Sequence, residues 1–357
     1  MVRLRTVSPK SRGWSRQRRG DGFVYLDSLG QHLPPEDTER CEALVIPPAW
    51  EDVWICPIPN GHLQAVGTDD AGRRQYLYHD EWRKKRDKSK HDRVLTVAAR
   101  LPQARRKVKT HLAMEGMPYE RALATAFRLL DLGFFRIGGE TYAEANNTFG
   151  LATIQKQHVT IENSEVVFDF IAKSGKERYV ALADDLVREA VQDLLRRRGG
   201  SEELLAYREG GEWHDVTSAD INVYIKEIVG GEVSAKDFRT WHGTVIAEVA
   251  LARVVDTVTS ATARKRAVSG AMKEVSSYLG NTPTVARSSY VDPRVIDLFN
   301  DGATIDPKLA RTDHNLADGF THGRIEKAVL NLLKAPKSQL REEYIKPAKE
   351  RQATLGA

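Results

Sequence analysis

Arginine, lysine and tyrosine side chains at four places in the sequence could act together on a phosphodiester. Arg136 follows an apolar helical stretch, and Arg239 lies near the start of a predicted helix. Tyr290 comes after a tight-turn sequence, and a predicted hairpin tip carries a lysine, either Lys173 or Lys176. Guanidinium groups pair with phosphate oxygens and stay charged, and phosphoryl transfer needs mainly positioning and charge neutralisation. Because a tyrosine can attack phosphorus and form a covalent intermediate, these residue types predict nucleophilic phosphoryl transfer.

The sequence motifs of several other enzyme classes are missing. The chain has no glycine-rich phosphate loop followed by Lys-Ser or Lys-Thr, no His-Glu-x-x-His and no Gly-x-Ser-x-Gly. Its two cysteines, Cys41 and Cys56, do not have the Cys-x-x-Cys spacing of a metal site. Nucleotide hydrolysis and metalloprotease chemistry therefore lack support, and we expect neither a metal nor another cofactor.

Short strand-like runs occupy residues 22–80, and helical periodicity begins near Arg93. The strand-like runs are rich in β-branched and aromatic residues: Phe23–Leu26, Val53–Cys56, Leu63–Val66 and Tyr76–Tyr78. The later periodicity predicts helices at Tyr119–Asp131, Leu182–Arg197, Ser218–Val229, Ala235–Arg253, Ala261–Leu279 and Thr284–Phe299. We therefore expect an α+β chain with a small antiparallel β-rich N-terminal domain and a mainly α-helical second domain.

One short β interruption is predicted inside the helical part. Thr153–Ile161 and Val166–Ile171 are predicted strands, and the chain returns at Arg178–Ala181 after the lysine-bearing tip. The predicted domains are a basic tail at 1–20, a β-rich domain at 21–92, a helical domain at 93–304 and a Lys-rich extension at 305–357. The extension contains an apolar helical patch, and it could bind DNA, dock on the helical domain or remain mobile.

Basic residues are unevenly distributed along the 357 residues, although the formal net charge is only +5. Clusters lie in residues 1–20, at Trp82–Arg93 and at Arg105–Lys109. Such clusters indicate a polyanion binder, and a solvated helix face or a disordered tail is the alternative interpretation of each. No apolar run approaches the roughly 18 residues of a membrane span, and no apolar segment follows the basic N-terminus. We therefore expect an intracellular protein.

Six short stretches together resemble the type IB DNA topoisomerases, in particular the short branch of poxviruses and bacteria. They follow one another in family-like order between about Val45 and Leu298: Ile46–Trp50, Gly72–His79, Arg136–Gly138, the Lys173 hairpin, Lys236–Thr240 and Gly280–Tyr290. The resemblance implies that the helical domain is a catalytic domain of the tyrosine recombinase and type IB topoisomerase type.

The resemblance also implies catalytic roles for residues at matching positions. Tyr290 resembles the nucleophile that becomes linked to the 3′ end of the cut DNA strand. Arg136 and Arg239 match the two arginines that stabilise the transition state, and Lys173 matches the general acid that protonates the leaving 5′ oxygen. Asn281 stands where many members have a histidine, and an amide can donate the same hydrogen bond to phosphate without a charge.

Other matching positions imply contacts with DNA. Lys236 resembles a further lysine that contacts phosphate. In the N-terminal domain, Arg73 matches a position near phosphate, and Gln75, Tyr76 and Tyr78 match positions that approach base edges in the major groove.

Two residues are alternative participants in catalysis. Lys176 flanks the same Ser-Gly tip as Lys173, and Lys173 is preferred because the family's lysine also follows an apolar strand and a small residue. His242 lies one helical turn after Arg239, where family members vary, and we interpret it as a structural residue.

The resemblance as a whole implies a DNA topoisomerase of type IB. Such an enzyme relaxes positive and negative supercoils without ATP, because it cuts one strand through a 3′-phosphotyrosyl intermediate, allows rotation and religates. We expect a monomer that acts on double-stranded DNA in the bacterial cytoplasm, at the nucleoid, without a membrane or nucleotide partner. The alternatives are a tyrosine site-specific recombinase, which typically has His-x-x-Arg in place of Lys236–Arg239, and a non-catalytic DNA-binding protein.

Overall fold

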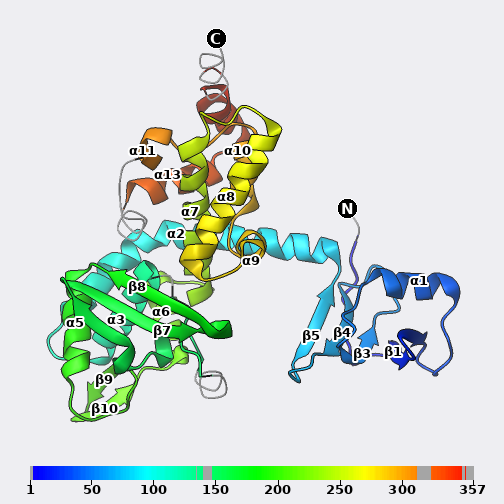
Figure 1. The fold of residues 1–357 in the computed structure, drawn as a ribbon, viewed down its shortest axis with the longest axis horizontal. Helices are drawn as coiled ribbons and strands as arrows, with labels where there is room; N and C mark the ends of the chain where they lie inside the picture. Colours follow the sequence, from blue (N-terminus) through cyan, green and yellow to red (C-terminus); the bar gives the residue numbers. More distant parts are fainter. Residues whose placement is uncertain (1–2, 134, 140–146, 312–322, 348–349, 351–357) are drawn as a thin grey trace. The chain divides into compact units, whose positions relative to one another are not determined.

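Five short strands form the antiparallel sheet of the first of two structural units (Figure 1). The computed structural model describes residues 3–133, 135–139, 147–311, 323–347 and 350. The chain divides into the units Met1–Lys90 and His91–Ala357. The first unit contains a sheet of order β2-β1-β3-β4-β5 and one helix, with the bounds Trp14–Arg19 (β1), Gly22–Leu26 (β2), Pro35–Ala43 (α1), Glu51–Ile55 (β3), Leu63–Thr68 (β4) and Arg74–Tyr78 (β5).

The first unit has a small hydrophobic core of its own. Cys41 of α1, Ile55 of β3 and Ala65 of β4 are completely buried there. Burial of such apolar side chains is the main stabilising contribution to folding. This core supports the β4–β5 hairpin, which carries the predicted DNA-contacting residues.

Strand β1 corrects part of the prediction that the first residues form a basic tail. The side chain of Arg16 is buried, and its guanidinium lies 4.1 Å from the centre of the Phe23 ring. The same guanidinium donates hydrogen bonds of 2.8–2.9 Å to the carbonyls of Ile46, Pro47 and Trp50. A buried arginine is well accommodated when its donors are satisfied in this way. The basic composition therefore concealed a strand that pairs with both β2 and β3.

The second unit combines a three-stranded sheet and a two-stranded hairpin, which lie beside α3, α5 and α6, with a group of helices that includes α7, α8, α10, α11 and α13 (Figure 1). Its strands are Val159–Glu162 (β6), Glu165–Ala172 (β7), Lys176–Leu182 (β8), Ala206–Glu209 (β9) and Glu212–Asp215 (β10). Its helices are Tyr119–Gly133 (α3), Asp185–Arg196 (α5), Ser218–Val229 (α6), Ala235–Val254 (α7), Ala261–Leu279 (α8), Pro283–Ser289 (α9), Pro293–Asn300 (α10), Pro307–Arg311 (α11), Arg324–Lys334 (α13) and Lys337–Gln339 (α14), followed by a π-helical turn at Leu340–Ile345. Helix α2 (Asp80–Leu112) contains the boundary between the two units. This architecture confirms the predicted α+β fold.

Two local predictions for the second unit were wrong, and one hairpin was missed. The strand expected from Thr153 begins only at Val159, because short 3-10 turns precede it. The single helix expected at 284–299 is two helices, because Pro293 cannot continue a helix and disfavours helical geometry in the residue before it. The hairpin β9–β10 was not predicted, although Gly210 and Gly211 are a turn signal between its strands.

Helix α7 is the central element of the second unit. Every residue from Asp237 to Val249 is buried, and α8, α10, α11 and α13 all contact the helix. A helix buried on all sides must satisfy its polar side chains within the protein. The partners of those side chains therefore decide where α7 lies.

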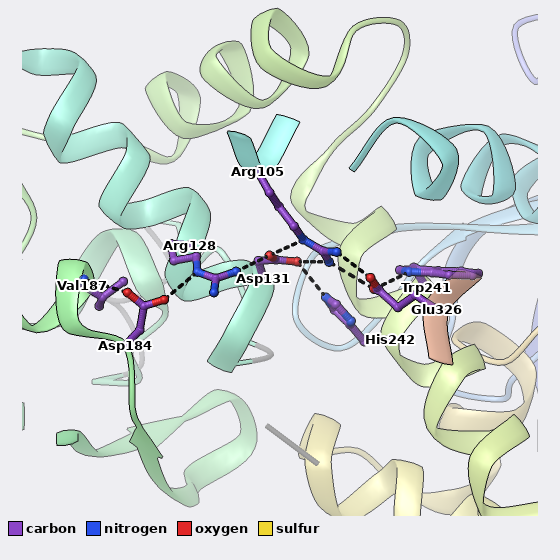
Figure 2. A network of polar contacts seen from close by, with 8 residues as sticks. All are labelled: Arg105, Arg128, Asp131, Asp184, Val187, Trp241, His242 and Glu326. Carbon is purple, nitrogen blue, oxygen red and sulfur yellow. Dashed lines mark hydrogen bonds and ion pairs between the residues drawn. The ribbon is translucent and has the colours of Figure 1, made fainter. Parts of the chain in front are cut away.

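A buried network of charged and polar groups joins α7 to α2, α3 and α13 (Figure 2). Asp131 of α3 accepts two hydrogen bonds of 2.8 Å from Arg105 of α2. The same guanidinium binds Glu326 of α13, which also accepts a hydrogen bond of 2.8 Å from the indole of Trp241 on α7. The His242 ring nitrogen lies 3.5 Å from the Asp131 carboxylate. Burial raises the pKa of Asp131, but the charge of Arg105 opposes this effect, and the net pKa lies below the ordinary value. The carboxylate is therefore ionised and holds the network together.

Described parts of the predicted C-terminal extension pack against α7. Ile305 is buried and its backbone N–H donates to Glu248 of α7 at 2.7 Å. Helices α11 and α13 both contact α7. Of the three possibilities raised by the sequence, docking on the second unit therefore holds for these residues.

Replacing Glu326 with Ala is expected to lower the free energy of unfolding by about 3 kcal/mol, because removing one member of a buried ion-pair network leaves its partners buried without compensation. The measurement is the urea midpoint of unfolding followed by tryptophan fluorescence. Lys327→Ala, on the exposed face of the same helix, is the control. An unchanged midpoint in Glu326→Ala would contradict the structural role of the network.

Candidate active site

A left-handed glycine and a proline shape the segment that carries Asn281 and Tyr290. Helix α8 ends at Leu279, and Gly280 continues the chain with a φ of 62°, a conformation that favours glycine. The Thr282 hydroxyl then accepts a hydrogen bond from the backbone of α9, which opens with a proline at its first position. Tyr290 ends α9 and its side chain is only 8% exposed. The sequence pattern Gly-Asn-Thr-Pro therefore fixes the direction in which α9 presents the tyrosine.

Two neighbouring residues of α7 hold the backbone of Tyr290 in place. Gly243 lies so close that a Cβ atom there would be 2.8 Å from the Tyr290 carbonyl oxygen and 3.2 Å from its Cβ. The Thr244 hydroxyl lies 3.4 Å from the same carbonyl and accepts a hydrogen bond of 3.0 Å from the Asp292 N–H. The tyrosine is thus packed directly against the central helix.

We expect Gly243→Ala to slow DNA cleavage by at least about 10-fold, since the new methyl group must push Tyr290 away from α7 and small misplacements of reacting groups are costly. Single-turnover cleavage of an oligonucleotide measures the effect. Gly270→Ala is the matched control, because a Cβ atom at this exposed position of α8 meets no other atom within 4 Å. A wild-type cleavage rate in Gly243→Ala would show that the tyrosine tolerates displacement.

Two arginines flank the tyrosine. The Arg239 side chain is 4% exposed, its Cζ lies 5.1 Å from the centre of the Tyr290 ring, and it donates a hydrogen bond of 2.6 Å to the Leu279 carbonyl. Arg136 donates to the Asn281 side-chain oxygen at 2.5 Å and to the Gly280 carbonyl at 3.3 Å. Both guanidiniums are therefore fixed by the turn after α8.

These charges change the acidity of the tyrosine. Burial raises the pKa of Tyr290, but the charges and hydrogen bonds of Arg239 and Arg136 lower it more, so the net pKa lies below the ordinary value. Burial, together with the charge of Arg136, lowers the pKa of Arg239 to about 10. The guanidinium is still charged at neutral pH, and the site therefore favours a phenolate beside two cations.

A pocket of about 360 Å³ brings most of the predicted catalytic residues together. Its lining includes Arg136, Lys173, Lys236, Arg239 and Tyr290. The hairpin tip that carries the first lysine is a 3-10 turn, Lys173–Gly175, between β7 and β8. The structure thus places two lysines, two arginines and a tyrosine, from distant parts of the sequence, around one space.

The remaining predicted or alternative participants lie beside this pocket. The Asn281 side-chain oxygen accepts a hydrogen bond from Arg136, which lines the pocket. The Lys176 amine donates to the Asn281 carbonyl at 3.3 Å and lines a smaller neighbouring pocket with Arg178. His242 belongs to the buried network with Asp131, which agrees with its interpretation as a structural residue.

Sequence reasoning missed two residues of the site. The Thr148 hydroxyl is buried in the pocket lining and has no hydrogen-bond partner among the residues that the structure describes. No local pattern distinguishes this threonine. Gly243 was also missed, although a glycine inside a helix is itself a signal of close packing.

The predicted DNA-contacting residues of the first unit form a separate group on the β4–β5 hairpin. The Asp69 carboxylate accepts hydrogen bonds from Arg73 at 2.9 Å and from the Gln75 amide at 2.8 Å. The rings of Tyr76 and Tyr78 stack with their centres 6.2 Å apart, and Tyr76 is 50% exposed. Hydrogen bonding to Arg73 lowers the pKa of Asp69 to about 2, so this carboxylate stays ionised at neutral pH and keeps the two side chains in place.

Within the described ranges, no group of three or more His, Cys, Asp or Glu side chains could hold a metal ion. None of the helices in the described part of the chain is both long enough and apolar enough to cross a membrane.

Comparisons with known proteins agree with the geometry. The family model described as "Eukaryotic DNA topoisomerase I, catalytic core" matches residues 79–303, and the one described as "Bacterial DNA topoisomerase IB, N-terminal domain" matches residues 22–69. The chain is 28% identical over 299 residues to "DNA topoisomerase 1B" of Acanthamoeba polyphaga mimivirus, covering 80% of this chain and 87% of the relative. It is 22% identical over 272 residues to "DNA topoisomerase I" of Monkeypox virus, covering 75% and 81%.

The first family model alone covers more than half of the chain and includes every residue that lines the pocket. The second covers most of the β-rich unit, so both units are accounted for. The resemblance found in the sequence is thereby confirmed, and the chain belongs to the type IB DNA topoisomerase family.

Proposed function

We propose that this protein relaxes supercoiled DNA by cutting and resealing one strand through Tyr290. The observation that carries the proposal is the single pocket that contains Tyr290, two arginines and two lysines. A phosphodiester entering this pocket would meet a nucleophile of lowered pKa and four cationic side chains.

The cutting step follows from these positions. The Tyr290 phenolate oxygen attacks phosphorus, the bond from phosphorus to the 5′ oxygen breaks, and the 3′ phosphate becomes linked to the tyrosine. Arg136 and Arg239 neutralise the charge that accumulates on the equatorial oxygens, and Asn281, Lys236 and Thr148 support the phosphate by hydrogen bonds.

Proton transfer completes the step. Lys173 donates a proton to the leaving 5′ oxygen, which departs as a hydroxyl group. Rotation of the DNA then removes supercoils of either sign, and the 5′ hydroxyl attacks the phosphotyrosyl bond to restore the strand. The phosphotyrosyl ester keeps the energy of the broken phosphodiester, and the reaction therefore needs no ATP.

The first unit is proposed to bind the duplex through Arg73, Gln75, Tyr76 and Tyr78. Support comes from the exposed, stacked tyrosines and from the ordering of the two polar side chains by Asp69. We further propose that the protein acts as a monomer in the bacterial nucleoid, since one chain supplies every catalytic group named above. Initial relaxation rates that are proportional to enzyme concentration would support the monomer.

The decisive experiment is relaxation of a supercoiled plasmid in EDTA without nucleotide. We expect full relaxation of positively and negatively supercoiled plasmids, and a covalent adduct at the 3′ end when the reaction is stopped with detergent. Strict dependence on magnesium or ATP would refute the proposal. Strand exchange between paired sites without relaxation would instead identify a recombinase.

Lys173→Ala should slow cleavage of ordinary DNA by about 100- to 10,000-fold, the usual effect of losing a general acid. A substrate with sulfur at the 5′ bridging position should restore the rate, because a thiolate leaves without a proton. Lys176→Ala is the matched control, three residues further along and bonded to the Asn281 carbonyl. If Lys176→Ala shows the sulfur-restored defect and Lys173→Ala does not, the general acid is Lys176.

A further inference from the structure

The carbonyl groups at the end of α8 are surrounded by cations. The last carbonyls of a helix carry a partial negative charge and lack partners within the helix. Here five successive carbonyls, from residue 277 to residue 281, each accept a hydrogen bond from a cationic side chain. The donors, in order, are Arg178 for Ser277 (3.2 Å) and Tyr278 (2.9 Å), Arg239 for Leu279 (2.6 Å), Arg136 for Gly280 (3.3 Å) and Lys176 for Asn281 (3.3 Å).

Arg136 and Arg239 line the pocket of Tyr290, whereas Arg178 and Lys176 lie outside it. Of these two, only Arg178 donates to two of the carbonyls. It lies on β8, where it pairs with Phe170 of β7, and these two strands lead into the tip that carries Lys173. Its two hydrogen bonds therefore connect the lysine-bearing hairpin to the end of α8. The turn after α8 holds both catalytic arginines, so Arg178, together with Lys176 at the start of β8, links the two halves of the site.

Close packing and charge both indicate that this link is specific. A Cβ atom on Gly280 would lie 3.4 Å from Cδ of Arg178, and the positive φ of this glycine brings the turn against the arginine. Burial lowers the pKa of Arg178, and so does the nearby charge of Arg136. The like charges of Arg178 and Arg136 repel each other. The carbonyls that each arginine binds at the end of α8 offset that repulsion.

We propose that Arg178 is a positioning residue for the proton-transfer step of DNA cleavage. By holding β8 against the end of α8, it sets the place of Lys173 relative to the phosphate bound by Arg136 and Arg239. Arg178 itself does not touch the reacting atoms. The inference rests on the proposed function of the site and adds a residue that neither the sequence motifs nor the family resemblance assigned.

The test compares two substrates in single-turnover cleavage by the full-length protein. Arg178→Met keeps the aliphatic chain but removes the donors. It should cleave ordinary DNA about 10- to 100-fold more slowly than wild type, because the lysine is no longer held in place. A substrate with 5′ bridging sulfur does not need the lysine proton, and Arg178→Met should cleave it within about 3-fold of wild type. Arg178→Lys, which keeps one cationic donor, should recover part of the loss.

The matched control is Arg264→Met. Arg264 also donates to the last carbonyls of a helix, those of Phe299 at 2.6 Å and Asn300 at 3.1 Å at the end of α10, but it lies outside the pocket. This variant should cleave both substrates at wild-type rates. A general requirement for capped helix ends would slow Arg264→Met as well, and that result would overturn the proposal.

Two further outcomes would overturn the proposal. The first is a wild-type rate of Arg178→Met on ordinary DNA, and the second is an equal loss on both substrates, which would mean that Arg178 serves the phosphate rather than the proton. If Arg178→Met does not fold, as judged by circular dichroism, Arg178→Lys and Arg178→Gln give the same comparison. Lys173→Ala in the same assay separates this inference from the proposed function: sulfur rescue of Lys173→Ala without rescue of Arg178→Met refutes the inference alone.

Discussion

Tyr290→Phe is expected to abolish DNA cleavage while leaving DNA binding intact. The change removes only the attacking oxygen, and loss of a catalytic nucleophile typically costs on the order of a million-fold in rate. The backbone and Cβ of the residue stay packed against Gly243, and its ring stays beside the Arg239 guanidinium, 5.1 Å from the ring centre. The measurements are plasmid relaxation and trapping of the covalent adduct.

Binding and a second tyrosine variant are the controls for this prediction. Gel-shift affinity should match the wild type and should fall steeply with salt, as it does for proteins that neutralise many phosphates. Tyr278→Phe, on α8 outside the pocket, should relax plasmids normally. A covalent adduct in Tyr290→Phe would remove this residue from the nucleophile role.

Arg239→Ala is expected to slow cleavage by about 1,000- to 100,000-fold, the range for a single arginine that stabilises a phosphoryl-transfer transition state. The variant loses the guanidinium beside Tyr290 and leaves the Leu279 carbonyl without its 2.6 Å donor. Arg239→Lys keeps the charge but not the planar fork, and it should recover only part of the rate. Single-turnover cleavage measures both variants, and a loss below about 10-fold in Arg239→Ala would exclude a transition-state role.

We also expect the two Arg239 variants to change the pH dependence of the cleavage rate. Arg239 is the larger of the two cationic influences that lower the pKa of Tyr290 against its burial. A lower pKa means more phenolate at a given pH, so removing the charge in Arg239→Ala should move the rise of the cleavage rate to higher pH. Arg239→Lys retains the charge and should move it less. Equal shifts in the two variants would show that the charge does not set the acidity of the tyrosine.

The sequence was sufficient to predict the five charged or nucleophilic residues of the pocket: Arg136, Lys173, Lys236, Arg239 and Tyr290. Arg136, Arg239 and Tyr290 each follow or begin a recognisable helical pattern, and local patterns report on helix ends and turns. The hairpin tip between β7 and β8 was also predicted, and the structure confirms it. These features depend on a few neighbouring residues, and local sequence therefore contains enough information.

Features that depend on distant partners could not be predicted. Arg16 seemed to belong to a basic tail because its partners, the carbonyls of residues 46–50, are remote in sequence. The importance of Gly243 emerges only when Tyr290 lies against it, and that of Arg178 only when α8 ends beside β8. In each case packing decides the role, and the residue type alone leaves several roles open.

The buried carboxylate of Glu326 has a consequence for the order in which the protein is made. Its partners Trp241 and Arg105 precede it by 85 and 221 residues, and Tyr290 also precedes it. At a translation rate of about 5–20 residues per second, Glu326 is synthesised roughly 10–45 s after Arg105. The growing polypeptide therefore contains the complete set of proposed cutting residues before the carboxylate that anchors α7 leaves the ribosome. Completion of the buried network around the central helix is consequently a late event, and a chain interrupted before Glu326 carries the tyrosine on a helix whose Trp241 lacks its carboxylate partner.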